Sequence, residues 1–234
     1  MNDEIPRHIS IILDGNGRWA KKQNKIRLFG HKAGAVSVRE TATRCAELGV
    51  EYLSLYAFSE ENWNRPADEV HGLMELMRRT VLDERETFRK NHIRFRVIGN
   101  LSRLSKELQG IIKMVEDETA ANTGMTLILM LSYSGKWDLL QATKRYAADC
   151  LAEGRELPLD EEGFSDYLAT AGIPDPDLLI RTSGELRISN YMLWQCAYTE
   201  FYFTPVLWPD FRKKDLDLAI ESYKQRERRY GKVK

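Results

Sequence analysis

Residues 8–19 read H-I-S-I-I-L-D-G-N-G-R-W, and they indicate which class of fold the chain adopts. Four of the first six residues, His8–Leu13, are apolar, which is typical of a short strand buried inside a sheet. Asp14 and Gly15 begin a turn, and a helix is expected to start near Arg18. A buried strand that leads through a glycine turn into a helix is the repeating unit of α/β proteins.

Short apolar runs of the same kind recur along the chain, separated by longer helical patterns. The other expected strands are Tyr52–Ala57, Ile93–Ile98, Met125–Leu131, Asp177–Ile180 and the weaker Phe201–Phe203. Strands and helices alternate with no repeat or linker between them. The sequence therefore predicts a single α/β domain over residues 1–234, with about six mostly parallel strands.

Two of the helical patterns are strongly amphipathic. One apolar stripe consists of Val70, Leu73, Met74, Met77 and Val81, and the other of Leu101, Leu104, Leu108, Ile111, Ile112 and Val115. Such stripes usually pack into a core, but they can also line a tunnel for a hydrophobic ligand. Periodicity alone leaves both interpretations open, and both helices stay candidates for the wall of a tunnel.

The 234 residues carry 35 Lys and Arg against 35 Asp and Glu, so the formal net charge is zero. A neutral chain is not expected to bind nucleic acid through a generally basic surface. The charge is nevertheless uneven, because residues 15–39 contain seven Lys and Arg and no acidic residue. Three widely spaced cysteines, an acidic N-terminus and apolar runs too short to span a bilayer predict a cytoplasmic protein in a reducing compartment.

The turn after the first expected strand is the first candidate site. Ligands of open parallel sheets bind at the carboxyl ends of the strands, where Asp14–Gly17 must lie. The glycines let backbone N–H groups approach an anion, and the following helix points its positive end to the same place. An ordinary Asp-Gly turn is the plain alternative. The cationic stretch that follows favours a diphosphate bridged to Asp14 by Mg²⁺.

Two further polar segments follow later strands. Ser59–Pro66 follows the second expected strand, where Pro66 can open the next helix. Arg181–Ser189 follows the fifth and places two arginines around a glycine-containing loop, which suits a clamp on a phosphate. Surface arginines paired with Glu185 are the plainer alternative for this loop. Three loops that can each bind an anion, at the ends of three strands, favour a phosphate site more than any one of them does.

Several familiar signatures are absent from the sequence. It contains no P-loop, no dinucleotide fingerprint and no zinc-binding spacing of His and Cys. It also has no Asp-Asp pair, so the aspartate-rich chemistry of the all-helical prenyl synthases is not expected. Because the P-loop and the dinucleotide fingerprint are missing, a nucleotide enzyme of a standard type is not expected.

Five motifs resemble the cis-prenyltransferase family, and its bacterial members in particular. They are D-G-N-G-R-W-A at 14–20, G-H-K-A-G at 30–34, Y-A-F-S-E-E-N-W-N-R-P at 56–66, R-T-S-G-E-L-R-I-S-N at 181–190 and L-W-P-D-F at 207–211. The resemblance implies a six-stranded, mainly parallel sheet around a hydrophobic tunnel. It also implies an enzyme that adds isopentenyl diphosphate units to an allylic diphosphate such as farnesyl diphosphate. In the bacterial members the product is undecaprenyl diphosphate, the precursor of the cell-wall lipid carrier.

The resemblance implies a role for each matching residue. Asp14 is implied to bind Mg²⁺ with the allylic diphosphate, and Asn62 to help remove the proton from the condensing unit. The residues implied to bind substrates are Gly15, Asn16, Gly17, Arg18, Trp19, Arg27, His31, Ser59, Glu60, Glu61, Trp63, Arg65, Arg181, Arg187, Ile188 and Ser189. Among these, Arg181, Arg187 and Ser189 match the clamp for isopentenyl diphosphate.

The resemblance also implies partners. Glu200 matches a metal-associated residue that the other subunit supplies, which implies a homodimer. The lipid product implies delivery to a membrane and transient membrane association. Three positions depart from the family's pattern: Leu186 stands where several bacterial members have His, Ser183 stands in place of Gly, and Ser132-Tyr133-Ser134-Gly135 replaces the more usual Asn-Tyr-Gly-Gly.

Two alternatives to an active synthase belong to other classes. A non-catalytic subunit of a heteromeric cis-prenyltransferase would keep the fold but lack the aspartate and the phosphate loop, both of which this chain retains. A nucleic-acid-binding protein is suggested only by Lys224–Lys234, which has six Lys and Arg. Its one aromatic residue, Tyr230, is too few for a stacking surface, so no nucleic-acid partner is expected.

Overall fold

The computed structural model of the chain describes residues 5–228. Its strands are β1 (His8–Ile12), β2 (Tyr52–Ser59), β3 (Arg94–Ile98), β4 (Thr126–Tyr133), β5 (Leu178–Arg181) and β6 (Glu200–Phe203). Each strand expected from the sequence is present, with its ends displaced by at most two residues. The acidic N-terminus (residues 1–4) and the end of the basic tail (residues 229–234) lie outside the described residues.

Helices connect and cover the strands. The α-helices are α1 (Asn16–Lys22), α2 (Arg27–Leu48), α3 (Ala67–Asp83), α4 (Arg85–Lys90), α5 (Lys106–Thr119), α6 (Gly135–Glu153), α7 (Glu161–Ser165) and α8 (Lys213–Lys224). The 3-10 helices are η1 (Glu60–Asn64), η2 (Leu101–Arg103) and η3 (Trp208–Asp210). Among residues 5–228, no helix combines the length and the apolar composition that a membrane span requires.

The strands form one sheet in the order β3-β4-β2-β1-β5-β6, and every pairing in it is parallel. The expectation of a mostly parallel sheet in a single α/β domain is confirmed for the described residues. β1 is an interior strand, with Ile9 aligned between Leu53 of β2 and Leu178 of β5. The chain runs to one side of β1 through β2, β3 and β4, and then returns to its other side at β5.

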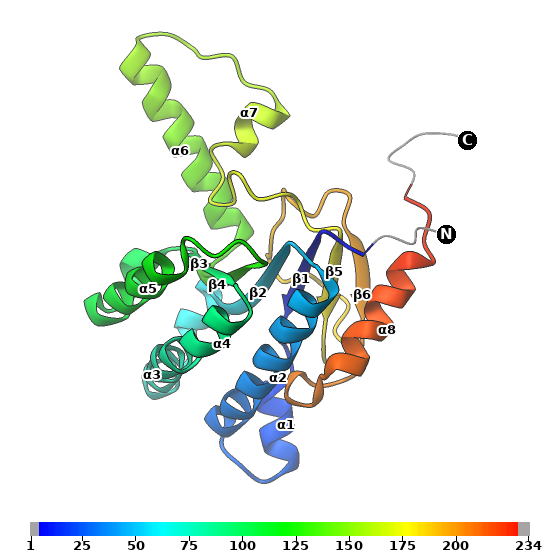
Figure 1. Cartoon of the computed structure of the whole chain (residues 1–234). Coiled ribbons are helices and arrows are strands. Elements are labelled where there is room, and N and C mark those ends of the chain that lie inside the picture. The colour runs from blue at the N-terminus through cyan, green and yellow to red at the C-terminus, as the bar shows by residue number, and fades with distance from the viewer. Residues whose placement is uncertain (1–4, 229–234) are drawn as a thin grey trace.

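Alternate strand residues face two separate cores, because successive side chains of a strand point to opposite faces. Ile9 and Ile11 belong to the larger core, which is closed by α2, α3, α5 and α8 (Figure 1). Ile12 and Tyr56 belong to the smaller core on the other face, where Tyr191 stacks on Tyr56 with ring centroids 4.1 Å apart. Most of α6 projects away from the body of the molecule (Figure 1).

The second amphipathic stripe does not form one helix, which corrects the sequence expectation. α5 begins only at Lys106, because the Oγ of Ser105 accepts a hydrogen bond from the N–H of Leu108 (3.2 Å) and caps the helix there. Leu101 instead opens η2, and Leu104 is in an extended conformation. Leu104 is still buried, so it packs at a helix-like spacing without being helical.

Two glycines let α2 approach α1 closely. A Cβ on Gly30 would lie 2.0 Å from the backbone oxygen of Asn16, and one on Gly34 would lie 2.5 Å from Oδ1 of Asn16. The same Gly34 Cβ would lie 2.8 Å from Cδ1 of Trp208, whose Nε1 donates to the Gly34 carbonyl oxygen (3.0 Å). The G-H-K-A-G motif therefore holds α2 against the first turn of α1, directly behind Asp14.

Candidate active site

The three polar segments found in the sequence follow three neighbouring strands. Asp14 follows β1, Ser59 ends β2 and Arg181 ends β5, and β1 lies between the other two. The sheet reverses its direction of winding between β1 and β5, and open α/β sheets bind ligands in the crevice at such a point. The fold thus gathers polar groups from across the chain at one edge.

Asp14 is held at this edge by backbone and side-chain donors. Its Oδ1 accepts a hydrogen bond from the N–H of Gly15 (2.6 Å), and its Oδ2 accepts one from Nη2 of Arg181 (2.9 Å). Nη2 of Arg18 lies 3.4 Å from the same oxygen. Partial burial acts to raise the pKa of Asp14, but the hydrogen bond and charge of Arg181, together with hydrogen bonds from Ser183 and Gly15, outweigh it, so the pKa lies below its ordinary value. Asp14 is therefore an ionised carboxylate at neutral pH.

Arg181 is almost completely buried, with 4% of its side chain exposed. Besides Asp14, its guanidinium donates to Oγ of Ser189 (2.7 Å) and to the backbone oxygen of Arg187. Its Nε has no hydrogen-bond partner within residues 5–228. A guanidinium fixed in this way is a rigid fork of donors, which suits a phosphate oxygen.

Arg18 and Arg187 share one carboxylate. Nη1 of Arg18 lies 3.1 Å from Oε1 of Glu185, and Nη1 of Arg187 donates to Oε2 of the same residue. The alternative of surface arginines paired with Glu185 is confirmed for Arg187 of this loop but is wrong for Arg181, which is buried and pairs with Asp14. Arg18 also donates to the backbone oxygen (3.0 Å) and the hydroxyl oxygen of Ser183. Arg18, Arg187 and Glu185 thus form one cluster of charges at the Arg181–Ser189 loop.

A second pair of arginines lies between α2 and α3. Nε of Arg27 and Nη1 of Arg65 lie 3.1 and 3.2 Å from the same oxygen, Oε1 of Glu69. Burial, and then the charges of Arg65 and Arg27, lower the pKa of His31 to about 4, so this imidazole is neutral at neutral pH. Its buried Nε2 has no partner in the described part of the chain. The sequence analysis missed Glu69, although its position four residues after Arg65 on a helix was a usable signal.

The loop after β2 is a helix cap as well as a candidate site. The N–H of Asn62 donates to Oγ of Ser59 (3.2 Å), and the N–H of Ser59 donates to Oδ1 of Asn62 (3.1 Å). Pro66 stands at the N-cap of α3, as the plainer interpretation expected. Glu61 accepts a hydrogen bond from Nδ2 of Asn190 (2.6 Å), which ties this loop to the loop after β5.

Glu60 and Trp63 are engaged with neighbouring elements. Nε1 of Trp63 donates to Oγ of Ser132 (2.8 Å), and that hydroxyl donates to Oε1 of Glu60 (2.5 Å). Arg103 lies over the ring of Trp63, 4.6 Å from its centroid, and donates to Oε2 of Glu60 (2.8 Å). These contacts fix the far end of the loop against β4 and η2.

Trp19 and Ile188 lie on opposite sides of the site. Nε1 of Trp19 donates to Oδ1 of Asp210 (2.7 Å), and its ring stacks on Phe29 at a centroid distance of 6.0 Å. Ile188 packs against the smaller core on the other face of the sheet. The L-W-P-D-F motif therefore positions Trp19 through Asp210. The motif also contacts the turn after β1, because the N–H of Trp208 donates to the Asp14 backbone oxygen (3.0 Å).

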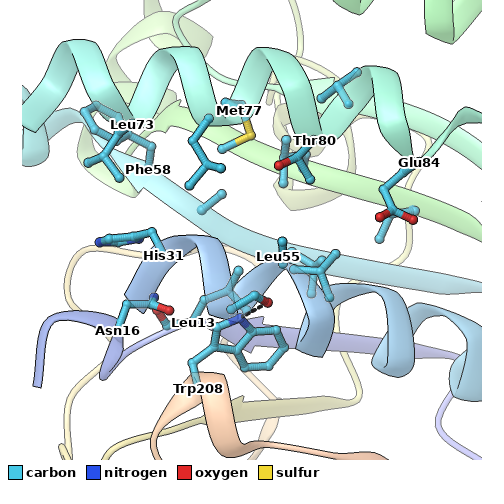
Figure 2. Close-up of a pocket in the computed structure, with 18 of the residues that line it drawn as sticks. Leu13, Asn16, His31, Leu55, Phe58, Leu73, Met77, Thr80, Glu84 and Trp208 are labelled. Atoms are coloured by element: carbon cyan, nitrogen blue, oxygen red, sulfur yellow. Dashed lines mark hydrogen bonds between the residues drawn. The ribbon is translucent and has the colours of Figure 1, made fainter. Parts of the chain in front are cut away.

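An apolar cavity begins directly behind these polar groups. Figure 2 shows Asn16 and His31 at one end, Glu84 at the other, and Leu73, Met77 and Thr80 of α3 along one side. The opposite side is formed by α2 and by strand residues such as Leu55. Its volume is about 110 Å³, smaller than the roughly 150 Å³ of an engineered protein cavity that holds benzene.

Only the first of the two amphipathic helices lines this cavity. Leu73, Met74, Met77 and Val81 of α3 are in its wall, whereas no residue of the second stripe is. α5 packs instead against β3 and the other side of α3, so Leu108, Ile112 and Val115 are core residues. The partner of α3 across the cavity is α2, whose weak apolar periodicity gave no such signal. Of the two interpretations that periodicity left open, lining of the cavity holds for α3 and packing into the core holds for α5.

Glu200 lies far from Asp14 within the chain. It opens β6 opposite Leu178, the first residue of β5, whereas Asp14 follows the other end of β1. Its Oε2 accepts a hydrogen bond from Nη1 of Arg226 (2.9 Å). Within residues 5–228, no three His, Cys, Asp or Glu side chains gather in a way that would hold a metal ion. A metal at Asp14 would therefore take its other ligands from a substrate, from water or from a second subunit.

Comparison with known proteins assigns this arrangement to a family. The family model described as "Putative undecaprenyl diphosphate synthase" matches residues 12–231. The chain belongs to the undecaprenyl diphosphate synthase family. Among curated relatives, a ditrans,polycis-undecaprenyl-diphosphate synthase of Vibrio cholerae is 50% identical, with 98% of this chain and 92% of the relative covered. An isoprenyl transferase of Fusobacterium nucleatum is also 50% identical, over 100% of this chain and 99% of the relative.

Solved structures of the family have the same fold. Lavandulyl diphosphate synthase from Lavandula x intermedia, determined with dimethylallyl diphosphate, matches with a TM-score of 0.93 and 38% identity, over 97% of this chain and 99% of that one. A probable undecaprenyl diphosphate synthase from Campylobacter jejuni matches with a TM-score of 0.82 and 33% identity, over 99% and 100% of the two chains. The expected family and fold are confirmed.

Two of the three positions where this family member departs from the usual motifs have local roles. Ser132 bridges Trp63 and Glu60, and Ser134 caps α6 by accepting a hydrogen bond from the N–H of Trp137 (3.3 Å). Ser183 has φ of 77°, a conformation that favours glycine, and its hydroxyl accepts from Arg18. Leu186 is exposed, and nothing in the structure explains its side chain.

Proposed function

We propose that this chain condenses isopentenyl diphosphate units with farnesyl diphosphate, forming cis double bonds and a long polyprenyl diphosphate, undecaprenyl diphosphate. The curated relatives from Vibrio cholerae and Escherichia coli carry the name of this activity and of the farnesyl starter. The observation that carries the proposal is the direct junction of a cationic, carboxylate-centred edge with an apolar cavity. A substrate with a diphosphate head and an isoprenoid tail requires both surfaces, one directly behind the other.

The allylic diphosphate is assigned to the side of the edge between α1 and α2. Its reaction breaks the bond between the allylic carbon and oxygen, so negative charge develops on the departing diphosphate. Arg18, Arg27, Arg65 and the backbone around Gly15–Gly17 are placed to stabilise that charge, which lowers the barrier because the charge is larger in the transition state than in the substrate. The ion pairs of Arg27 and Arg65 with Glu69 hold both cations in place before the substrate arrives.

Mg²⁺ fits this site through Asp14. The ion ordinarily binds substrate phosphates together with one or two protein carboxylates, and Asp14 is an ionised carboxylate at the diphosphate end of the cavity. When bound, Mg²⁺ would supply further stabilisation of the leaving diphosphate. Glu200 of a partner subunit is the second candidate ligand, which requires the homodimer that the sequence resemblance implies.

Isopentenyl diphosphate is assigned to Arg181, Arg187 and Ser189. The new carbon–carbon bond forms between the allylic cation and the isopentenyl double bond, and a proton must then leave the condensing unit. Asn62 is placed in the loop beside this clamp, where its amide oxygen already accepts the Ser59 N–H. We therefore assign Asn62 first to positioning the loop and, through it, the groups that accept the proton.

The apolar cavity protects the cation from water and receives the growing chain. Each added unit buries further apolar surface, at roughly 0.8 kcal/mol for every CH₂ group. At about 110 Å³ the cavity is too small for a chain of many units. Elongation therefore requires the cavity to widen.

The test is a synthesis assay with the purified chain alone, farnesyl diphosphate, labelled isopentenyl diphosphate and Mg²⁺. We expect Mg²⁺-dependent incorporation of label and extractable lipid of a single long chain length. Asp14→Ala should lose activity by orders of magnitude while its circular dichroism spectrum stays native. Turnover like that of the unaltered chain in this variant would remove Asp14 from the mechanism. A chain that is inactive alone but active with a partner protein would instead identify a subunit of a heteromeric enzyme.

A further inference from the structure

The outer surface between α2 and α3 has a groove that the proposed chemistry does not use. It runs along the seam of the two helices, with a volume of about 840 Å³, and α2 and the loop before it contribute Lys25, Ile26, Phe29, Lys32 and Arg39. These are exposed residues on the outside of the molecule, whereas the apolar cavity lies on the inner side of the same helices.

Apolar and cationic side chains alternate along this face of α2. Phe29, Lys32, Val36 and Arg39 follow one another at spacings of three and four residues, which places them on one outward stripe of the helix. Phe29 is 41% exposed and Val36 47%, and Ile26 in the preceding loop is 75% exposed. Exposed apolar side chains can enter a membrane interface, while cations beside them attract anionic lipids.

The charge of this face is only partly neutralised by the protein itself. Lys21, Lys22, Lys25 and Lys32 have no ion-pair partner within residues 5–228, whereas the arginines of the same stretch do. Across the groove, Glu75 of α3 is already held by Arg78 and Arg79, both at 2.7 Å. Asp83 also lines the groove and has no ion pair within residues 5–228, so it offsets one of the two unpaired lysines of the lining, Lys25 and Lys32. The remaining positive charge, with Lys21 and Lys22 on the neighbouring helix, attracts anionic lipid headgroups.

The groove and the inner cavity share a thin wall. Ala35, Leu76, Thr80 and Glu84 line both of them. The carboxylate of Glu84 is buried in this wall and is gripped from outside by Arg39, whose Nε lies 2.9 and 3.1 Å from its two oxygens. An apolar chain that leaves the cavity between α2 and α3 enters the groove directly.

We propose that the groove between α2 and α3, with Ile26, Phe29 and Val36 at its edge, is the face that docks onto an anionic lipid bilayer. The lysines meet the headgroups, and the exposed apolar side chains enter the interface. The thin wall of the cavity then faces the acyl region, so that a polyprenyl product, under the function proposed above, passes into lipid without crossing water.

Vesicle sedimentation tests the docking without using catalysis. The probe is a vesicle of equal parts phosphatidylcholine and phosphatidylglycerol, compared with phosphatidylcholine alone, at low and high salt. We expect binding to the anionic vesicles that high salt weakens. Lys25→Ala and Lys32→Ala should each weaken it about fivefold, and the double variant Ile26→Ser/Val36→Ser should weaken it by about tenfold or more.

Matched controls come from α6, on a different part of the molecule. Leu151 is 83% exposed there and Lys144 is exposed, so Leu151→Ser and Lys144→Ala make the same chemical changes elsewhere and should leave binding unchanged. Equal loss in both sets, or equal binding to neutral vesicles, would overturn the proposal. So would a change from dimer to monomer in Ile26→Ser/Val36→Ser, since the face would then belong to a second copy of the chain.

The proposed function and the proposed docking face are tested by different measurements, the synthesis assay and vesicle binding. Synthesis in detergent should stay normal in Ile26→Ser/Val36→Ser, because neither residue is assigned to substrate. Native vesicle binding by a chain with no synthase activity would refute the proposed function and support the docking face. Normal synthesis with no vesicle binding would refute the docking face alone.

Discussion

At the residue scale, the site depends on how a few charged groups are neutralised by one another. Asp14 is stabilised as a carboxylate by Arg181, while Glu69 and Glu185 each hold two arginines. Before substrate binds, the cations that would grip a diphosphate are thus occupied by carboxylates of the protein. When substrate binds, its diphosphate replaces the protein carboxylates as the partner of these arginines. This exchange limits the desolvation that binding requires, and it also limits the affinity for the diphosphate.

Arg181→Ala should mainly weaken the binding of isopentenyl diphosphate. Hydrogen bonds to charged groups contribute about 1.5–3 kcal/mol, so we expect KM for this substrate to rise roughly 10- to 100-fold. Steady-state kinetics with each substrate varied in turn checks this. Arg187→Ala, in which the lost side chain is exposed, should have a smaller effect. An unchanged KM in Arg181→Ala would place the residue outside the substrate site.

His8 should make the folded state sensitive to acid. It is fully buried, its Nδ1 donates to the carbonyl oxygen of Pro174 (2.6 Å) and its Nε2 accepts from the hydroxyl of Ser54 (2.7 Å). Burial lowers its pKa to about 4 from the ordinary 6.5, so between these values the unfolded chain binds a proton that the folded chain does not. Stability is therefore complete above pH 6.5 and falls as the pH drops towards 4, by up to ~3 kcal/mol for this residue.

Urea unfolding measured across this pH range checks the linkage. His31, with the same lowered pKa of about 4, should add a contribution of the same sign. A His8→Gln variant will be less stable overall, but the slope of its unfolding free energy against pH should be smaller than that of the unaltered chain. Equal slopes would mean that His8 is protonated alike in both states.

At the element scale, the active edge depends on close approach between helices and loops. α1, α2 and η3 meet at Gly34, the apolar cavity lies between α2 and α3, and Arg39 of α2 is bonded to Glu84 at the end of α3. The contact at Gly34 should not tolerate added side-chain volume, and the contact at Glu84 should not tolerate the loss of its ion pair.

Gly34→Ala should push α2 away from Asn16 and Trp208. Overpacking of this kind typically costs about 1–3 kcal/mol, and activity should fall because α1 carries the diphosphate loop. Chemical denaturation and the synthesis assay check both effects. Gly110→Ala is the matched control: a Cβ there meets nothing within 4 Å, so α5 should be stabilised by roughly 0.5–1 kcal/mol. Equal stability of the two variants would contradict the packing argument.

Arg39→Ala should destabilise the junction of α3 and α4. The Glu84 side chain is 6% exposed and would lose its bidentate partner, whereas Arg39 is half exposed. We expect a loss of about 1–3 kcal/mol, below the range for a fully buried pair. Adding Glu84→Gln should restore part of the loss in a denaturation experiment. Arg7→Ala, which breaks an exposed pair with Glu51, should have no measurable effect.

At the scale of the whole molecule, the predicted metal ligand Glu200 is too far from Asp14 to share a metal with it within one chain. Glu200 opens β6 at the opposite end of the sheet from Asp14. If Glu200 serves a metal, it must serve the site of a second copy, and the protein is active only as a dimer.

Mixed dimers show whether Glu200 acts in the active site of the partner subunit or in that of its own chain. Asp14→Ala and Glu200→Ala should each be inactive as homodimers. In a dimer of one chain of each kind, one site combines both defects and the other has neither, so random mixing should restore about a quarter of full activity if the dimer has two-fold symmetry. No recovery on mixing, with dimer formation confirmed by sedimentation, would place Glu200 outside the partner's site.

The sequence by itself determined the strands, the family and most of the candidate site. Buried parallel strands are short, continuous apolar runs, so their positions are readable locally, and the motifs after them carry Asp14, Arg65 and Arg181. Local patterns were misleading where a single cap intervenes, since Ser105 starts α5 later than the Leu101–Val115 stripe suggested.

Only the tertiary structure decided which segments meet. The order β2-β1-β5 brings three distant loops to one edge, and no local pattern encodes strand order. It also decided that the cavity lies between α2 and α3 and that α5 does not line it, because a helix stripe records that a face is covered but not by what. Glu69 and Glu185 acquire their importance in the same way, through arginines that folding places beside them.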